Sequence, residues 1–328
     1  MNHVSDVVQD LLREQLVSRR MRLQAALAHP GSTEHLHHLL GEVDAALGRL
    51  DHGAYGRCET CGDPIEADRL IADPLLRYCL DHLTPGEHQA LQRDLDLAAK
   101  IQRGLLPDRA LAHPGWDFAY EYHPAGPVSG DYCDVMTRPD GGAYFLLGDV
   151  AGKGVAASML MTQLHGMFRS LVHMNLPLAT LIERASTIFC DSTLPSHYAT
   201  LTGVQAWPDG TVEACNAGHL PLLLIAPAGV SRFDSNSLPI GMFCSARYDT
   251  TRVHLDPGDT LVAFTDGLSD AEDEHGAEFG IDRIEAACQA LAGEPPTHLA
   301  SSLVVSARRF EARAAQADDI TVLVVRRA

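Results

Sequence analysis

Four aspartates, each next to the end of a predicted strand, are the residues of this chain best suited to chemistry. They are Asp131, Asp149, Asp266 and Asp318. Mg²⁺ and Mn²⁺ prefer oxygen ligands, so carboxylates that converge at strand ends suit these hard cations. Two such ions, about 4 Å apart, can clamp a phosphoryl group and activate the water that attacks it.

The first two aspartates are symmetric about a turn. Asp131 and Asp149 are equally far from Asp140, which lies in the turn sequence Pro139-Asp140-Gly141-Gly142 between two β-like runs. A hairpin there would place the two carboxylates opposite each other on one face, where they repel unless a cation or proton intervenes. The alternative is that both cap turns at the hairpin's open end, and the pair alone does not decide between these interpretations.

A second constellation has the spacing of a zinc site. Cys58 and Cys61 form one C-x₂-C pair, and Cys79 and His82 form a C-x₂-H pair after 17 intervening residues. Each pair places two ligands on one side of a tight bend, as a tetrahedral Zn²⁺ site requires. The alternative is a set of buried or spare cysteines.

The periodicity of the first part of the chain predicts helices. Residues 5–28 read as one helix, and a second follows the break at 29–31. The second helix alternates spacings of four and three, which predicts an antiparallel helical hairpin, with a solvated pair of helices as the alternative. The apolar positions of that helix are Leu36, Leu40, Val43, Leu47 and Leu50.

A third helix is predicted over 85–106, with a seam that suits a homodimer or a docking helix. The seam residues are Leu91, Leu95, Ala98, Ile101 and Leu105. From Pro107 onward, short β-rich runs alternate with turns and with helical stretches, of which 155–173 and 297–315 are the clearest.

Composition and charge exclude some functions. The chain has 328 residues and a net charge of −18, and both halves are acidic, which argues against nucleic acid as the main partner. No apolar run approaches the roughly 20 residues that span a bilayer, and the start of the sequence lacks a signal-peptide core. We therefore expect a cytoplasmic protein without a membrane partner, whose cysteines are thiols or ligands rather than disulfides.

Weaker candidates have plainer interpretations. Cys133, Cys190, Cys215, Cys244 and Cys288 are expected to be buried small apolar residues. The segment Gly152-Lys153-Gly154 could touch phosphate at a helix start, but its glycines are expected rather to permit a tight strand-to-helix turn. His219 is expected to be structural.

The segment around the cysteines resembles the DksA/TraR zinc-finger family. The resemblance covers about residues 5–85, including the helical hairpin, and implies one Zn²⁺ held by Cys58, Cys61, Cys79 and His82. The sequence departs from that family in two ways. His82 stands where the family has a fourth cysteine, and the hairpin tip at 28–35 lacks the acidic pattern that members use on RNA polymerase.

The rest of the chain resembles the metal-dependent protein phosphatases of type 2C, specifically the bacterial SpoIIE/RsbU branch, over about residues 97–326. The motifs occur in family order. They are Ala99-Lys-Ile-Gln102, Leu105-Leu-Pro107, Val128-Ser-Gly130-Asp131, Gly148-Asp149-Val-Ala-Gly152, Asn216-Ala-Gly218-His219, Leu238-Pro-Ile-Gly241, Phe264-Thr-Asp266-Gly267 and Asp318-Asp-Ile-Thr321.

This resemblance implies an α/β fold, in which two antiparallel sheets flanked by helices form an α-β-β-α sandwich. It also implies hydrolysis of phosphoserine and phosphothreonine by a hydroxide that bridges two Mn²⁺ or Mg²⁺ ions. The implied metal ligands are Asp131, Asp149, the Val150 carbonyl, Asp266 and Asp318, with Asp149 and Asp266 as the catalytic pair. Asp134 and Asp319 are expected to support these ligands.

The expected domains are a helical hairpin with a zinc finger at 1–84, a linker helix at 85–106 and a phosphatase domain at 107–328. The resemblance implies a phosphorylated protein substrate, commonly an anti-sigma-factor antagonist with a STAS domain. The zinc finger would regulate the enzyme or sense a signal, and the alternative is a finger whose zinc is structural only. The alternative function is a zinc-finger adaptor that binds RNA polymerase or another protein, with a vestigial phosphatase half.

Overall fold

The structure is a computed structural model that describes residues 6–28, 34–83, 85–109, 113–138, 141–194, 196–312, 314 and 316–328. The chain divides into two compact units, Met1–Asp94 and Leu95–Ala328. Helix α4 (Pro85–Arg103) spans this division. The predicted domain boundaries at 84 and 106 therefore stay predictions.

The first unit begins with the expected helical hairpin. Helices α1 (Asp6–Leu27) and α2 (Glu34–Asp51) pack antiparallel, since Arg13 near the start of α1 pairs with Asp51 at the end of α2 at 2.8 Å. Leu12 and Val43 are fully buried within the shared core of this unit. Of the predicted hairpin tip at 28–35, residues 29–33 lie outside the described residues.

The hairpin continues into the cysteine segment, which contains the short helix α3 (Ala67–Ala72) and the 3₁₀ turn η1 (Leu80–His82). Helix α4 ends three residues before the expected end at 106. Its side chains Leu91 and Ile101 are 43% and 58% exposed, whereas Leu105, just after α4, packs on the core of the second unit. Homodimerisation through this helix stays a prediction.

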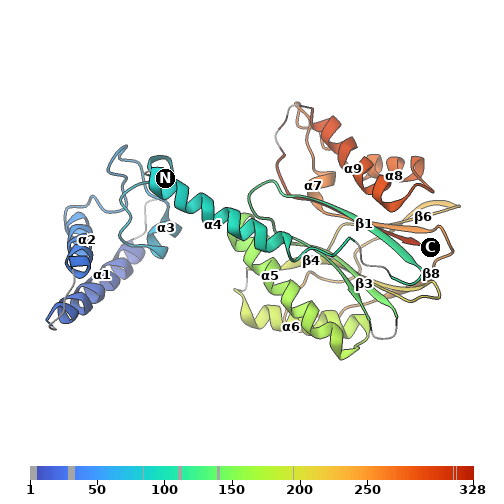
Figure 1. The fold of residues 1–328 in the computed structure, drawn as a ribbon, viewed down its shortest axis with the longest axis horizontal. Helices are drawn as coiled ribbons and strands as arrows, with labels where there is room; N and C mark the ends of the chain where they lie inside the picture. Colours follow the sequence, from blue (N-terminus) through green and yellow to red (C-terminus); the bar gives the residue numbers. More distant parts are fainter. Residues whose placement is uncertain are drawn as a thin grey trace. The chain divides into compact units, whose positions relative to one another are not determined.

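The described strands of the second unit form two antiparallel five-stranded sheets (Figure 1). In spatial order, the first sheet contains β1 (Trp116–His123), β10 (Ile320–Arg327), β9 (Thr260–Phe264), β6 (Leu222–Ala226) and β7 (Gly229–Phe233). The second sheet contains β2 (Asp131–Thr137), β3 (Ala143–Val150), β4 (Ala199–Ala206), β5 (Thr211–Ala217) and β8 (Thr251–His254).

Helices cover the outer face of each sheet. Helices α5 (Gly154–Leu171) and α6 (Leu178–Ser192) pack on the second sheet, with η2 (Val172–Met174) between them in the chain. Helices α8 (Ile281–Ala290) and α9 (Pro296–Glu311) pack on the first sheet, and the one-turn helix α7 (Asp266–Ser269) follows β9. The expected sandwich is confirmed.

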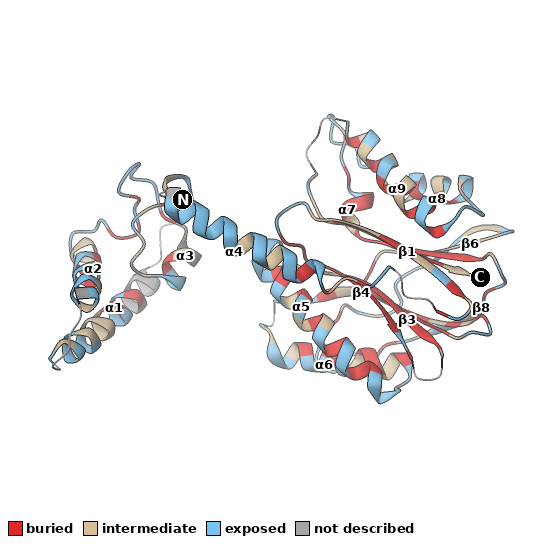
Figure 2. Cartoon of the chain, viewed as in Figure 1, coloured by how far each residue is buried: buried red, intermediate tan, exposed pale blue. Residues whose placement is uncertain are grey.

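Alternation along the strands produces this layering. In β2, Cys133 and Val135 face the other sheet, whereas Tyr132 and Met136 face α5 and α6. The central strands β2 and β3 are therefore buried along most of their length (Figure 2). Each sheet thus has an inner face toward the other sheet and an outer face toward helices.

The predicted hairpin is confirmed in its register. Strands β2 and β3 pair antiparallel with Asp131 directly opposite Asp149. The turn residues Pro139 and Asp140 lie outside the described residues.

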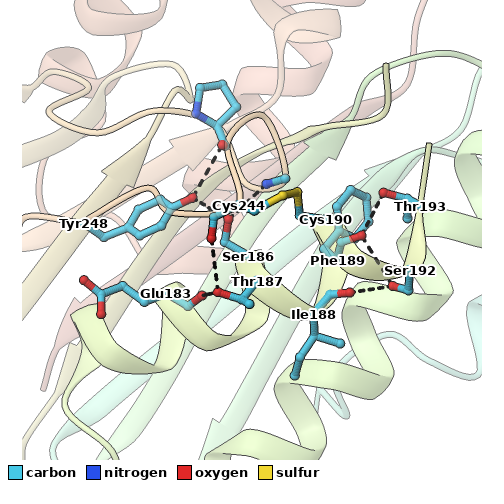
Figure 3. Close-up of a disulfide and its surroundings, with 12 residues drawn as sticks. Glu183, Ser186, Thr187, Ile188, Phe189, Cys190, Ser192, Thr193, Cys244 and Tyr248 are labelled. Carbon is cyan, nitrogen blue, oxygen red and sulfur yellow. Dashed lines mark hydrogen bonds between the residues drawn. A yellow bond between two sulfur atoms is a disulfide. The ribbon is translucent and has the colours of Figure 1, made fainter. Parts of the chain in front are cut away.

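Two of the cysteine predictions are wrong. Cys190 in α6 and Cys244 in the segment after Ile240 form a disulfide, with their Cα atoms 5.5 Å apart (Figure 3). Cys190 is half-buried and Cys244 is exposed. The two cysteines are 54 residues apart in the sequence, so no local pattern predicts their contact. Tertiary packing brings them within disulfide distance. The other three, Cys133, Cys215 and Cys288, are buried thiols as expected.

Within the described residues, no helix is both long and apolar enough to cross a bilayer.

Two glycines in the second unit provide a test of the packing. A Cβ atom at Gly148, in the middle of the sheet, would lie 2.4 Å from the Thr200 carbonyl oxygen, whereas one at Gly166 on α5 would meet nothing within 4 Å. We expect Gly148→Ala to lower the free energy of unfolding by about 1–3 kcal/mol because of overpacking. Gly166→Ala should raise it by about 0.5–1 kcal/mol, since alanine favours a helix. Urea unfolding of both variants checks the pair, and equal effects would contradict the described register.

Candidate metal centres

The carboxylate of Asp131 is fixed deep between the sheets. Its side chain is 2% exposed, and its Oδ2 accepts hydrogen bonds from the hydroxyls of Thr265 at 2.9 Å and Thr321 at 2.5 Å. Both threonines come from the other sheet or its end, so Asp131 joins the two sheets. Its Oδ1 accepts no hydrogen bond from the part of the chain that the structure describes, and it suits an ion.

Asp266 and Asp318 reach the same end of the sandwich from the other sheet. Asp266 is the first residue of α7, directly after β9, and Asp318 precedes β10 by two residues. Because β9 and β10 are paired neighbours, these two carboxylates lie close together. A Cβ at Gly267 would lie 2.1 Å from the Asp319 carbonyl oxygen, so the Thr-Asp-Gly sequence needs glycine there.

Burial and the charges of neighbouring aspartates raise the pKa values of three of these carboxylates. Burial, followed by repulsion from Asp266 and Asp318, raises the pKa of Asp149 to about 7. Burial and the charge of Asp149 raise the pKa of Asp131 well above its usual value. Burial and Asp318 likewise raise the pKa of Asp266. Carboxylates held together in this way need cations or protons to offset their repulsion.

Oxygen atoms of Asp149 and Val150 lie beside Gly130 at this site. A Cβ atom at Gly130 would lie 3.2 Å from the Val150 carbonyl oxygen and 3.3 Å from Asp149 Oδ1. Two of the oxygens that the resemblance assigns to the ions therefore lie close to the same point beside Gly130. Hard oxygen donors from four segments fit Mg²⁺ or Mn²⁺.

The aspartates are spread more widely than a single compact ion site. Among the described residues, only the cysteine cluster brings three or more metal-ligand atoms within 4.8 Å of one another. The two ions that the resemblance implies, about 4 Å apart, would need a wider set of carboxylates than one ion does. One cationic side chain also reaches it, because Lys153 Nζ lies 2.8 Å from Asp318 Oδ2.

The structure supports the predicted role of Asp319 but not that of Asp134. Asp319 accepts hydrogen bonds from the backbone N–H groups of Ala125 at 2.7 Å and Gly130 at 3.0 Å, and so holds the segment before Asp131. The expectation for Asp134 is wrong, since it lies three positions after Asp131 and faces the helices instead. There its carboxylate binds Arg169 at 2.8 and 2.5 Å.

Sequence reasoning missed Thr265 and Thr321 as parts of this site, and it favoured a turn over a phosphate contact for the segment around Lys153. The only available sign was position, because Thr265 precedes Asp266 and Thr321 ends the Asp318 motif. His219, expected to be structural, lies nearby with its Nδ1 2.8 Å from the Thr200 hydroxyl. Burial lowers the pKa of His219 to about 4, so its imidazole is neutral at pH 7.

The zinc candidates gather in the first unit. The ligand atoms of Cys58, Cys61, Cys79 and His82 all lie within 4.8 Å of one another. The Cys61 and Cys79 sulfurs are 3.8 Å apart, which matches the edge of a tetrahedron with Zn–S bonds of about 2.3 Å. Burial opposes ionisation of Cys58, but N–H groups of Cys61, Cys79 and Thr60 outweigh it and lower the thiol pKa to about 6. A thiolate is the form that binds zinc.

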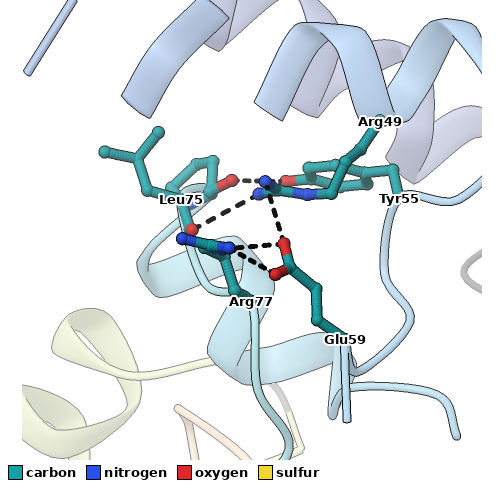
Figure 4. A network of polar contacts seen from close by, with 6 residues as sticks. Arg49, Tyr55, Glu59, Leu75 and Arg77 are labelled. Carbon is teal, nitrogen blue, oxygen red and sulfur yellow. Dashed lines mark hydrogen bonds and ion pairs between the residues drawn. The ribbon is translucent and has the colours of Figure 1, made fainter. Parts of the chain in front are cut away.

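An ion-pair network holds the two halves of this cluster together (Figure 4). Glu59, between the first two cysteines, pairs with Arg77, which precedes Cys79 by two residues, and with Arg49 of α2 at 3.4 Å. The Tyr55 hydroxyl donates to the Pro74 carbonyl at 2.9 Å. The network ties the cysteine loop to the helical hairpin, and sequence reasoning did not find it.

A sandwich of two antiparallel sheets with carboxylates at one end is the architecture of the type 2C phosphatase class. The solved SiaA-PP2C domain of Pseudomonas aeruginosa has this fold, with a TM-score of 0.65, 24% identity, and coverage of 74% of this chain and 99% of that chain. The sequence model of the family described as Stage II sporulation protein E (SpoIIE) matches residues 139–328. Since that match spans more than half of the chain, the chain belongs to the SpoIIE family.

The first unit has its own match, because the prokaryotic dksA/traR C4-type zinc-finger model covers residues 53–81. His82 lies one residue beyond it.

Curated relatives agree with this assignment. Protein IcfG of Synechocystis sp. is 28% identical over 224 residues, which cover 58% of this chain and 35% of that protein. Phosphoserine phosphatase RsbU of Bacillus subtilis is 23% identical over 194 residues, which cover 58% of each protein. The chain therefore matches about a third to just over half of the length of these relatives.

The hydroxyls that bind Asp131 generate a prediction. We expect the double variant Thr265→Val and Thr321→Val to weaken Mn²⁺ binding by about 10–100-fold, since such supporting groups orient a metal ligand. Calorimetric titration of Mn²⁺ into the full chain measures this. Thr187→Val is a control, because that exposed threonine lies on α6. Unchanged affinity in the double variant would show that Asp131 needs no such support.

The cysteine cluster leads to a prediction about the zinc content of the protein. The purified chain should contain about one Zn²⁺, and Cys79→Ser should lose it, because three remaining ligands hold zinc poorly. Elemental analysis measures the content. Cys288→Ser is the control, since Cys288 is a buried thiol in the second unit. Equal zinc in both variants would refute the ligand set.

Proposed function

We propose that this chain is a metal-dependent protein serine/threonine phosphatase of bacterial signalling. The observation that carries the proposal is the coupling of Asp149 to three partners: it lies opposite Asp131 in one sheet, and Asp266 and Asp318 of the other sheet raise its pKa. Membership of the SpoIIE family and the similarity to the phosphoserine phosphatase RsbU support it.

Two Mn²⁺ or Mg²⁺ ions would be held by Asp131, Asp149, the Val150 carbonyl, Asp266 and Asp318. When bound, such ions supply an activated water and stabilise charge on the phosphoryl oxygens. Asp149 would be the shared ligand, because it lies opposite Asp131 while Asp266 and Asp318 of the other sheet raise its pKa. Asp149 and Asp266 are therefore the proposed catalytic pair.

The chain's own groups orient this site. Thr265 and Thr321 fix one oxygen of Asp131, and the other oxygen would be available to hold an ion. Lys153 is 68% exposed in its side chain at the start of α5, where it partners Asp318 and offers positive charge to an incoming phosphate. The half-buried Asp266 and Asp318 open the site toward solvent, as a phosphate on a protein surface requires.

The proposed substrate is a phosphorylated protein, namely an anti-sigma-factor antagonist with a STAS domain. This choice follows from the resemblance to the SpoIIE/RsbU branch. The zinc-finger domain, 1–84 by our boundaries, would regulate the phosphatase domain, 107–328, or sense a signal, and the linker helix would serve a homodimer. We propose a cytoplasmic location for this activity.

The adaptor alternative, a zinc finger that binds RNA polymerase beside a vestigial phosphatase half, has less support. A vestigial site has no need for buried, mutually repelling carboxylates, which burden the fold. All four aspartates are present together with the threonines that orient Asp131.

Loss of a central ligand tests the proposed activity. We expect Asp149→Ala and Asp266→Ala each to lower Mn²⁺-dependent phosphate release from a phosphoserine protein by at least about 100-fold, since removing the groups that hold charge-stabilising ions costs on that order. Asp282→Ala is the matched control, because this aspartate on α8 is 96% exposed. Full hydrolysis by both site variants would refute the assignment.

A further inference from the structure

A buried glutamine holds both backbone polar groups of one residue beside the carboxylate site. Gln102, in the last turn of α4, donates from Nε2 to the Ser129 carbonyl oxygen at 2.7 Å and accepts at Oε1 from the Ser129 N–H at 2.9 Å. Gln102 is 5% exposed and Ser129 is fully buried. The side-chain amide thus pairs with Ser129 as a neighbouring strand would.

The segment that Gln102 holds leads directly into Asp131. The Ser129 hydroxyl accepts from the Asp131 N–H at 3.0 Å, and the Gly130 N–H donates to Asp319 at 3.0 Å. The Gly130 carbonyl accepts from the Val150 N–H at 3.3 Å. Ser129 and Gly130 are therefore held from three directions, by α4, by the loop before β10 and by the end of β3.

Without Gln102, two buried polar groups of Ser129 would lack these partners. An unsatisfied buried N–H or C=O is costly, so the segment would shift to find water or another partner. Because the Asp131 N–H is bonded to the Ser129 hydroxyl, such a shift would move the start of β2 as well. Asp131 and the carbonyl of Val150, whose N–H is bonded to Gly130, would then lose their fixed geometry.

We propose that Gln102 is a positioning residue for the carboxylate site: it fixes Ser129 and Gly130, and through them the Asp131 carboxylate and the Val150 carbonyl, in the arrangement that binds Mn²⁺ or Mg²⁺. This inference rests on the proposed function of the site. Gln102 touches neither ion nor substrate and acts only through the backbone of Ser129.

Only a glutamine amide provides both halves of this contact at this reach. Asparagine is shorter by one methylene group, and a glutamate carboxylate would face the Ser129 carbonyl without a proton to donate. Methionine matches the length and favours a helix, but has neither the donor nor the strong acceptor. Gln102→Met therefore removes the two hydrogen bonds while it preserves shape.

The experiment compares Gln102→Met with Gln289→Met in the full chain. Gln289 is an exposed glutamine on α8, so the control carries the same substitution on a helix away from the site. Three quantities are measured: Mn²⁺ affinity by calorimetry, hydrogen exchange of the amides at 129–131 in metal-free protein, and phosphate release over a range of Mn²⁺ concentrations.

We expect Gln102→Met to weaken Mn²⁺ binding by about tenfold or more, the usual scale for residues that orient metal ligands. Exchange should speed up at 129–131 but not in β4 and β5. Saturating Mn²⁺ should restore most of the rate, because every ligand remains present. Gln289→Met should match the wild type in all three measurements.

Wild-type Mn²⁺ affinity in Gln102→Met would overturn the inference, as would a lowered rate that saturating Mn²⁺ does not restore. If Gln102→Met fails to fold, Gln102→Asn, which keeps the amide but shortens its reach, is judged by the same criteria. Affinity and exchange need no substrate, so they test the inference even if the wild type releases no phosphate. Failure of the proposed function would instead appear as unchanged Mn²⁺ binding in Asp149→Ala.

Discussion

Repulsion among buried carboxylates is the constraint on which the site depends. Asp131 and Asp149 face each other across one hairpin, and Asp266 and Asp318 approach from the other sheet. A fold that concentrates negative charge in this way needs opposing charge or hydrogen bonds to hold it. Thr265 donates to Asp131 for this reason, and the remaining carboxylate oxygens are left to cations.

The sandwich is what brings these groups together. Alternation along β2 and β3 turns Asp131 and Asp149 to the inner face, where the end of the other sheet meets them. The same alternation sends Asp134 outward to Arg169. Three positions along a strand therefore separate a proposed ion ligand from a residue that anchors a helix.

Local patterns were readable from the sequence, and distant contacts were not. The symmetry about Asp140 gave the register of β2 and β3, because a hairpin pairs residues equidistant from its turn. The spacing of the cysteines likewise predicted that Cys58, Cys61, Cys79 and His82 lie together. The Thr321 bond to Asp131 spans 190 residues, and the Cys190–Cys244 disulfide also depends on how distant elements pack. No periodicity or spacing records such contacts.

The two candidate metal centres therefore differ in how metal binding is linked to folding. The cluster from Cys58 to His82 draws its ligands from one short segment, so zinc and that segment can order together. The aspartates come from four segments that meet only when both sheets are paired, so the fold must precede the ions there. Loss of zinc should disorder its own segment, whereas loss of Mn²⁺ leaves a folded sandwich. In that sandwich, the position of Asp131 rests on contacts such as the one from Gln102.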